Sequence, residues 1–263
     1  MRNRRLAATA VAVVALALTV LGVVLAATDP NPGGVTRDPL ALHGFPPKTA
    51  HLVISAASST LQASVNLTVD FRNADATGVA TVGLSAAGEA FNVVLTGRHL
   101  YLRSAAESTG PWYQVSTPTL PFFGLSLELT KPDLALISGY HSRTVSHDGY
   151  LTTYTYDFAH AALTPLFAGR STTARLGTVD WSITVGSEGE LTATALTVSA
   201  GGQTSTLSAS VQAYNAPAVV SIPSVGPIAR VAPREVARLL HSAGLGSILL
   251  PRGLLAGGAA TVN

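Results

Sequence analysis

The stretch that decides the fold is residues 179–223, VDWSITVGSEGELTATALTVSAGGQTSTLSASVQAYNAPAVVSIP. Apolar side chains occupy every second position of residues 179–185, which is the period of a half-buried β-strand. Two glycine-containing turns separate this run from two further runs, at residues 191–199 and 207–214. The stretch therefore predicts an antiparallel meander of three strands. Its side chains are small, apolar or threonine, which suits a wide surface of low charge.

Two other regions show the same β pattern. Residues 63–115 contain four or five short runs at close spacing, with a hairpin turn expected at Gly97–Arg98. Residues 143–158 are typical of a hairpin whose turn lies at residues 147–149. With the meander, these runs predict an antiparallel β-sheet.

Short helices are expected between the β regions. Residues 49–62 place apolar side chains roughly on one helical face. Residues 130–139 and 233–244 each combine an early proline with a closing glycine, which are helix start and stop signals. Residues 159–169 fit either a short helix or a loop. The expected fold class is therefore α+β, an antiparallel sheet covered by a few short helices.

The composition excludes several classes of function. Charged residues make up 11% of the chain, against about 25% in ordinary soluble proteins. A net charge of +2 gives no support for nucleic-acid binding. The chain has no cysteine, which rules out disulfides, thiolate metal sites, thiol nucleophiles and lipid attachment to an N-terminal cysteine.

The N-terminus carries an export signal. Arg2, Arg4 and Arg5 precede an uncharged apolar run at residues 6–27. This run is close to the ~20 residues that span a bilayer, and its small residues near Ala26 also offer a cleavage site. Residues 1–27 are therefore either a signal peptide or an uncleaved anchor helix. We expect the body to be exported, facing the periplasm or cell wall when anchored and secreted when cleaved.

Three short motifs resemble a known family. Val211–Val219 is similar to a strand ending in Tyr-Asn and a proline, and Gly97–Leu102 followed by Pro111–Tyr113 is similar to that family's central strands. The family is the LppX/LprAFG group of actinobacterial envelope lipoproteins, whose architecture is similar to LolA and LolB. The resemblance covers about residues 49–223. It departs at residues 24–28, where the family's lipobox cysteine is missing.

The resemblance implies a fold and a function. The family's curved antiparallel sheet forms a half-barrel that helices close, around an apolar cavity for acyl chains. The expected domains are the N-terminal segment 1–27, a Pro/Gly-rich linker 28–48, the half-barrel 49–223 and a C-terminal extension 224–263. The expected function is non-enzymatic binding of lipids or glycolipids, for transport or presentation in the bacterial cell envelope. The alternative is a structural or interaction β-domain with a filled core and no ligand.

Apolar residues of the strands and of the middle segment are the candidate cavity residues, because a lipid carrier needs apolar walls and a cover. The alternative, that these side chains fill an ordinary core, applies at every position. The candidate wall residues are Val65, Leu67, Val69, Phe91, Val93, Leu95, Trp181, Ile183, Leu196, Val198 and Val211. The candidate cover residues are Phe122, Phe123, Leu134, Leu136 and Ile137.

Competing chemistry has little support in the sequence. His141, His147 and Asp148 could meet across a hairpin and hold zinc, but no tight ligand spacing occurs. The nucleophile elbow of a hydrolase is missing, and residues 83–87 lack its second glycine. No catalytic residue, cofactor or metal is therefore predicted.

The expected partners are lipid or glycolipid acyl chains, the membrane through an uncleaved N-terminal helix, and an envelope transporter. Five arginines either lie at a cavity mouth, where they pair with a phosphate or an acidic head group, or are ordinary surface charges. They are Arg98, Arg103, Arg143, Arg170 and Arg175.

Overall fold

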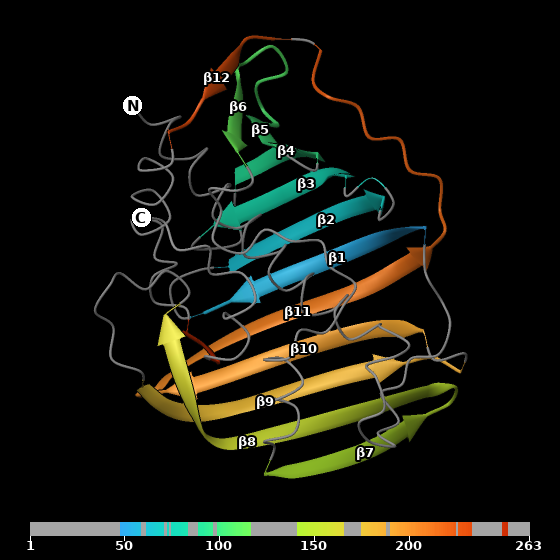
Figure 1. Cartoon of the computed structure of the whole chain (residues 1–263), viewed down its shortest axis with the longest axis vertical. Coiled ribbons are helices and arrows are strands. Elements are labelled where there is room, and N and C mark those ends of the chain that lie inside the picture. The colour runs from blue at the N-terminus through green and yellow to red at the C-terminus, as the bar shows by residue number, and fades with distance from the viewer. Residues whose placement is uncertain are drawn as a thin grey trace.

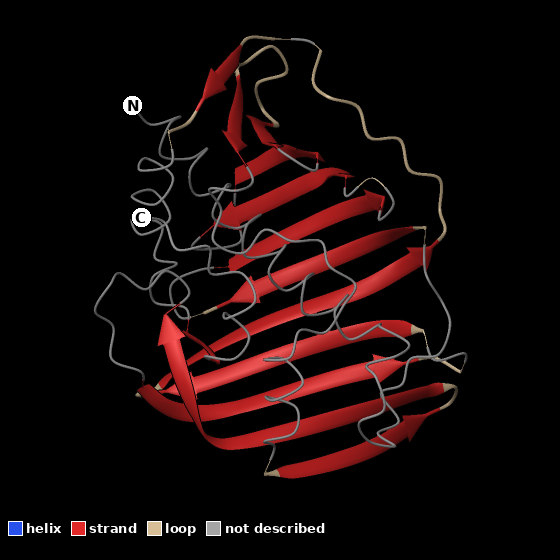
Figure 2. Ribbon diagram, viewed as in Figure 1, coloured by secondary structure: helices blue, strands red, loops and turns tan. Residues whose placement is uncertain are grey.

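The described part of the chain forms a single large β-sheet (Figures 1 and 2). The computed structural model describes residues 48–58, 62–70, 73, 75–83, 89–96, 99–116, 141–165, 175–187, 190–224, 226–232 and 249–251. These residues form strands and their connections, and none of them is helical.

Thirteen strands make up this sheet. In spatial order, twelve of them run β12-β6-β5-β4-β3-β2-β1-β11-β10-β9-β8-β13, and β7 pairs with another part of β8. All neighbours are antiparallel except β12 and β6, which are parallel, so the sheet is mixed. The strands are β1 (Thr49–Ala57), β2 (Gln62–Asp70), β3 (Asp75–Gly83), β4 (Glu89–Thr96), β5 (His99–Ser104), β6 (Trp112–Ser116), β7 (Ser142–Asp148), β8 (Leu151–Pro165), β9 (Arg175–Val185), β10 (Leu191–Ala200), β11 (Gln203–Tyr214), β12 (Ile228–Arg230) and β13 (Leu249–Pro251).

The pairing of β1 with β11 joins two halves of the sheet. One half continues from β1 through β2 to β6, and the other continues from β11 through β10 to β7. Thr49 Oγ1 donates a hydrogen bond to the carbonyl oxygen of Ala216 at 2.6 Å, across 167 residues of sequence. Asn215, at a φ of 54°, ends β11 beside the start of β1, and its side-chain oxygen accepts a hydrogen bond from the Lys48 N–H. Two strands that lie about 150 residues apart in sequence thus pair at the centre of the sheet.

The predicted meander is confirmed, but the predicted fold class is wrong. Strands β9, β10 and β11 pair antiparallel in the predicted order. The structure is all-β in its described residues, not α+β with covering helices. Residues 49–57 of the predicted first helix are strand β1, whose side chains alternate between buried and partly exposed. Residues 159–165, predicted as helix or loop, continue strand β8.

Several sequence-based expectations lie outside the described residues. These are the N-terminal hydrophobic helix at residues 1–27 and the helices at residues 130–139 and 233–244. Strands β12 and β13 fall within the predicted C-terminal extension, and both pair with the main sheet. The portion of the chain described by the structure contains no helix long and apolar enough to span a membrane.

One face of the sheet, which we call the inner face, is mostly apolar, and most of its side chains outside β7 are buried. In β1 and β2 every second side chain is buried, and directly paired residues of an antiparallel ladder share a face. The opposite, outer face carries small hydroxyl side chains. One of its rows crosses eight strands in register as Thr144, Thr155, Ser182, Ala195, Ser208, Ser55, Ser64 and Thr81.

Two glycines on the inner face permit close approach between strands. A Cβ at Gly78 in β3 would overlap the Asn66 carbonyl oxygen of β2 and lie 2.9 Å from the Cα of Leu67. A Cβ at Gly177 in β9 would lie 2.5 Å from the Ser199 carbonyl oxygen of β10. β3 and β9 are each the third strand from the β1–β11 junction. Each half of the sheet therefore has one position where backbones approach too closely for a side chain.

We predict that Gly78→Ala lowers the free energy of unfolding by about 2 kcal/mol or more, because the new methyl group must push two backbones apart. The matched control is Val79→Ala in the same strand, at a position that is 41% exposed. It should cost at most about 1 kcal/mol. Urea unfolding of both variants measures the difference, and equal losses would contradict the close approach.

Candidate ligand-binding face

All eleven predicted wall residues lie on the inner face. Val65, Leu67 and Val69 come from β2, and the others come from β4, β9, β10 and β11. Cross-strand pairing places them on one side, and all are buried except the half-buried Val211. The five predicted cover residues, at positions 122–137, lie outside the described residues. The structure thus brings the wall residues together, and their role in ligand binding stays a prediction.

The inner face is continuous across the two halves of the sheet. A single row runs in register from β7 to β4, and apart from the phenol hydroxyl of Tyr154 its only polar group is the hydroxyl of Thr194. Neighbouring strands are about 4.8 Å apart, so the row extends about 40 Å along the sheet, more than the ~30 Å hydrocarbon core of a bilayer. Its residues are Val145, Tyr154, Ile183, Thr194, Ala209, Ile54, Val65, Ala80 and Phe91.

The sequence analysis missed other residues of this face. Leu52 and Ile54 were assigned to a helix, although the apolar residues at every second position from 50 to 56 also fit the period of a strand. The ring of Tyr156 lies 6.3 Å from that of Trp181, its direct partner across β8 and β9. Further missed residues, which the alternation alone could have found, include Leu100, Leu102, Phe158, Val179, Leu207 and Ala209.

A hydrogen bond to Trp181 explains the buried Thr194 in this row. The indole Nε1–H of Trp181 donates to Thr194 Oγ1 at 2.9 Å, and both side chains are buried. Thr194 Oγ1 in turn donates to the Ser182 carbonyl oxygen at 2.9 Å. The threonine therefore satisfies a buried indole donor that a purely apolar neighbour would leave unpaired.

Thr194→Val keeps the shape of the side chain but removes the acceptor for the Trp181 indole N–H. We predict a loss of about 1–3 kcal/mol in the free energy of unfolding, which is the cost of a buried unpaired donor. Thr194→Ser keeps the hydroxyl and should lose less. Combining Thr194→Val with Trp181→Phe removes both partners, and a double-mutant cycle from denaturant unfolding should then show coupling. Independent, additive losses would refute the pairing.

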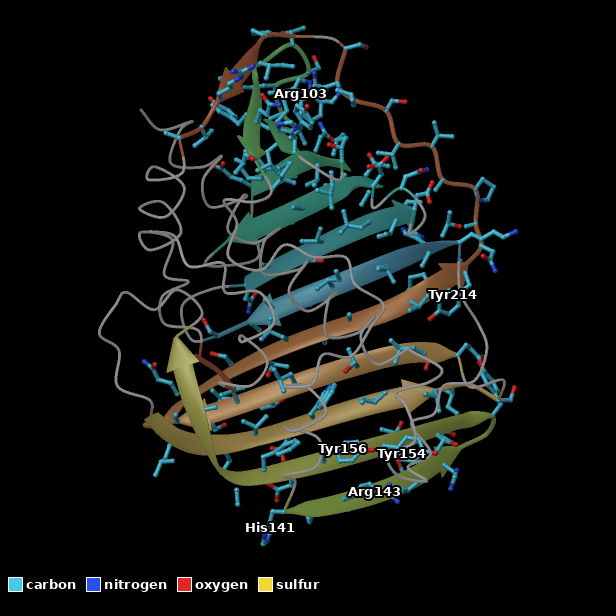
Figure 3. The ribbon with its side chains drawn as sticks, viewed as in Figure 1. Arg103, His141, Arg143, Tyr154, Tyr156 and Tyr214 are labelled. Atoms are coloured by element: carbon cyan, nitrogen blue, oxygen red, sulfur yellow. The ribbon has the colours of Figure 1, made fainter. Side chains whose placement is uncertain are left out.

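Tyr214 is the last residue of strand β11 (Figure 3). Its hydroxyl donates a hydrogen bond to the Leu191 carbonyl oxygen at 2.6 Å. Burial raises the pKa of Tyr214 well above its ordinary value, and the nearby carboxylate of Glu190 raises this pKa further. The hydroxyl is therefore a neutral structural group, because ionisation would place a negative charge in a desolvated site beside a carboxylate.

The raised pKa of Tyr214 predicts a pH dependence of stability. An unfolded tyrosine ionises near pH ~10, whereas the folded form holds its proton to higher pH. The stability that Tyr214 contributes is thus complete below pH ~10 and is lost as the pH rises beyond it. Tyr214→Phe should lose about 1 kcal/mol at neutral pH and fall less steeply above pH ~10. Tyr150→Phe, at a turn position 72% exposed, should keep the wild-type slope in denaturant titrations.

The arginines and histidines singled out from the sequence are dispersed. Arg103 lies on the outer face, with its guanidinium 4.5 Å from the centre of the Trp112 ring. Arg143 lies on the inner face of β7, at the opposite end of the sheet (Figure 3). Arg175 begins β9, and the side chains of Arg98, Arg170 and Arg175 lie outside what the structure describes.

The hypothetical zinc site does not assemble. His141 and His147 are six residues apart along the β7 segment, and His147 Nδ1 is 3.1 Å from Thr152 Oγ1. Asp148 occupies the other face of β7 from His147. Searching the described residues finds no group of three histidine, cysteine or acidic side chains placed to hold a metal ion.

No model of a known protein family matches the chain, and no curated protein matches it significantly. The similarity to the LppX/LprAFG family therefore rests on the motifs quoted above and stays a prediction.

Proposed function

We propose that this chain binds acyl chains of lipids or glycolipids on its inner face and carries or presents them in the bacterial cell envelope, without catalysing a reaction. The observation that supports this most directly is the continuous apolar row from β7 to β4. Acyl chains need an extended apolar surface and few polar groups. The export signal and the family resemblance support the envelope as its location.

A second candidate is a structural or interaction β-domain whose inner face packs only against its own chain. The near-complete burial of side chains such as Leu52, Ile54 and Val65 favours it, because core packing is the usual fate of such residues. The two candidates differ in whether a lipid can reach the inner face. Access of a lipid to this face can be measured directly.

The chain's two tryptophans report on the two faces separately. Trp181 is on the inner face and 1% exposed, whereas Trp112 is on the outer face, where it packs with Val94 and Tyr101. Each can be made the only tryptophan by a conservative substitution of the other. An acyl chain carrying bromine atoms quenches a tryptophan that it contacts, so the two single-tryptophan variants distinguish inner-face from outer-face binding.

We expect lipids with brominated acyl chains to quench the fluorescence of Trp112→Phe, which retains Trp181. They should leave Trp181→Phe, which retains Trp112, nearly unchanged. The same lipids without bromine control for indirect effects, and native mass spectrometry of the full chain should show one bound lipid at the same concentrations. Equal quenching of both variants would indicate adsorption to the surface. Absence of both quenching and bound lipid would favour the filled-core domain.

A further inference from the structure

Strand β7 forms an exposed edge of the sheet (Figure 1). All seven of its residues are exposed, and among the described strands β8 is its only neighbour. The side chain of Val145, in the middle of the strand, is 43% exposed. An edge strand carries a row of backbone N–H and C=O groups that can pair with another strand. β7 therefore offers a template to which one more strand can be added.

The turn after β7 determines where its backbone groups point. Gly149 and Tyr150 form a two-residue turn between the paired residues Asp148 and Leu151. Gly149 has a φ of 57°, as expected in a hairpin turn of this length. The pair that closes such a turn is hydrogen-bonded, and hydrogen-bonded pairs alternate along an antiparallel ladder. Val145, three residues before Asp148, thus belongs to a pair that is not hydrogen-bonded, so its N–H and C=O point away from β8.

β7 lacks the features that usually protect an edge strand from pairing. Protected edges are short, or they carry lysine, proline or a bulge. β7 has seven residues with neither lysine nor proline, and its seven pairs with β8 are in unbroken register. By contrast, the outer strands β12 and β13 have three residues each, and β13 ends in proline. Among the described strands, β7 is therefore the edge best suited to pairing.

We propose that β7 docks a second copy of this chain, so that two β7 strands pair antiparallel across a two-fold axis at Val145. Such an axis keeps the inner faces of both copies on the same side, so it lies at a residue and not between two residues. Val145 is the middle residue of β7, and an axis there lets all seven residues pair. An axis at Thr144 or Ser146 leaves two of the seven unpaired.

The side chains of β7 are compatible with this register. The pairs are Ser142 with Asp148, Arg143 with His147, Thr144 with Ser146, and Val145 with itself. No pair joins two carboxylates, and the Ser142 hydroxyl can donate a hydrogen bond to the Asp148 carboxylate of the second copy. Facing hydroxyl side chains and facing β-branched side chains stabilise a sheet. An edge of seven residues is small for a protein interface, so we expect a weak dimer.

The test measures the monomer–dimer equilibrium of the full chain in a mild detergent at pH 8 by analytical ultracentrifugation. We expect a dimer that dissociates on dilution. Val145→Lys places two like charges at the axis and should raise the dimer Kd about tenfold or more. The matched control is Val79→Lys, at a position 41% exposed in the interior strand β3. It should change the dimer Kd less than about twofold, because it is remote from the β7 edge.

A second variant separates docking from folding. Val145→Pro removes an N–H that points away from β8, and edge strands tolerate proline where the N–H faces outward. We expect this variant to weaken the dimer as Val145→Lys does. The urea midpoints of both variants should stay close to that of the unsubstituted protein, because the pairing of β7 with β8 is retained.

Introduced cysteines test the register, because the chain has no cysteine of its own. Thr144 of one copy and Ser146 of the other form a pair that is not hydrogen-bonded, with Cα atoms about 4.5 Å apart, which suits a disulfide. A mixture of Thr144→Cys and Ser146→Cys chains should therefore give the mixed disulfide on mild oxidation, which its mass identifies. Two Thr144→Cys chains place their cysteines on a diagonal of about 7–8 Å and should give little disulfide.

Three results would overturn the inference. A dimer Kd that Val145→Lys leaves unchanged would place the contact on another surface of the protein. Disulfides formed mainly between two Thr144→Cys chains would exclude an axis at Val145. A monomer at every concentration, without the mixed disulfide, would show that β7 does not dock a second copy. None of these results affects the lipid-binding proposal, which the tryptophan measurements test separately.

Discussion

The structure depends on keeping the apolar side chains of many strands on one face of a single sheet. Because side chains alternate with a period of two, a slip of one residue would move a strand's apolar set to the outer face. Three register shifts keep the apolar side chains on the inner face where their spacing along a strand departs from two. In β11 the register shift next to Leu52 lets both Val211 and Tyr214 face inward. Shifts in β8 and β10 do the same for their strands. Bulges here maintain one continuous apolar surface.

The alternation of apolar and polar residues predicted the strands well, because a period of two can be recognised within a few consecutive residues. The three runs after Val179 form the expected meander, and the wall residues chosen by alternation share one face. The pattern failed at residues 49–57, where Leu52, Val53 and Ala56 fit a helical face as well as a strand. Pairing with β2 and β11 decides between the two, and β11 lies about 150 residues away in sequence. The α+β class was wrong for the same reason.

The distinction between the arginines could not be read from the sequence. Arg103 and Arg143 both lie in short strands, and the composition of the chain gives no reason to assign them to different faces of the sheet. Only the register shows that Asn92 and Arg103 share the outer face while Arg143 and Tyr156 share the inner one. The inner face is also unequal along its length. The rings of Tyr154, Tyr156, Phe158 and Trp181 gather near β7, whereas aliphatic residues dominate β1 to β5.

The central position of β1 has a consequence for how the molecule is made. β1 comes first among the strands but gains its second neighbour only from β11, about 150 residues later. A chain synthesised or translocated from its N-terminus exposes the free edge of β1 until residues 203–214 arrive. Contacts this distant in sequence slow folding, and unpaired edges beside apolar surface favour aggregation. Completion of the sheet therefore comes after most of the chain has emerged, and the nascent protein needs protection during that interval.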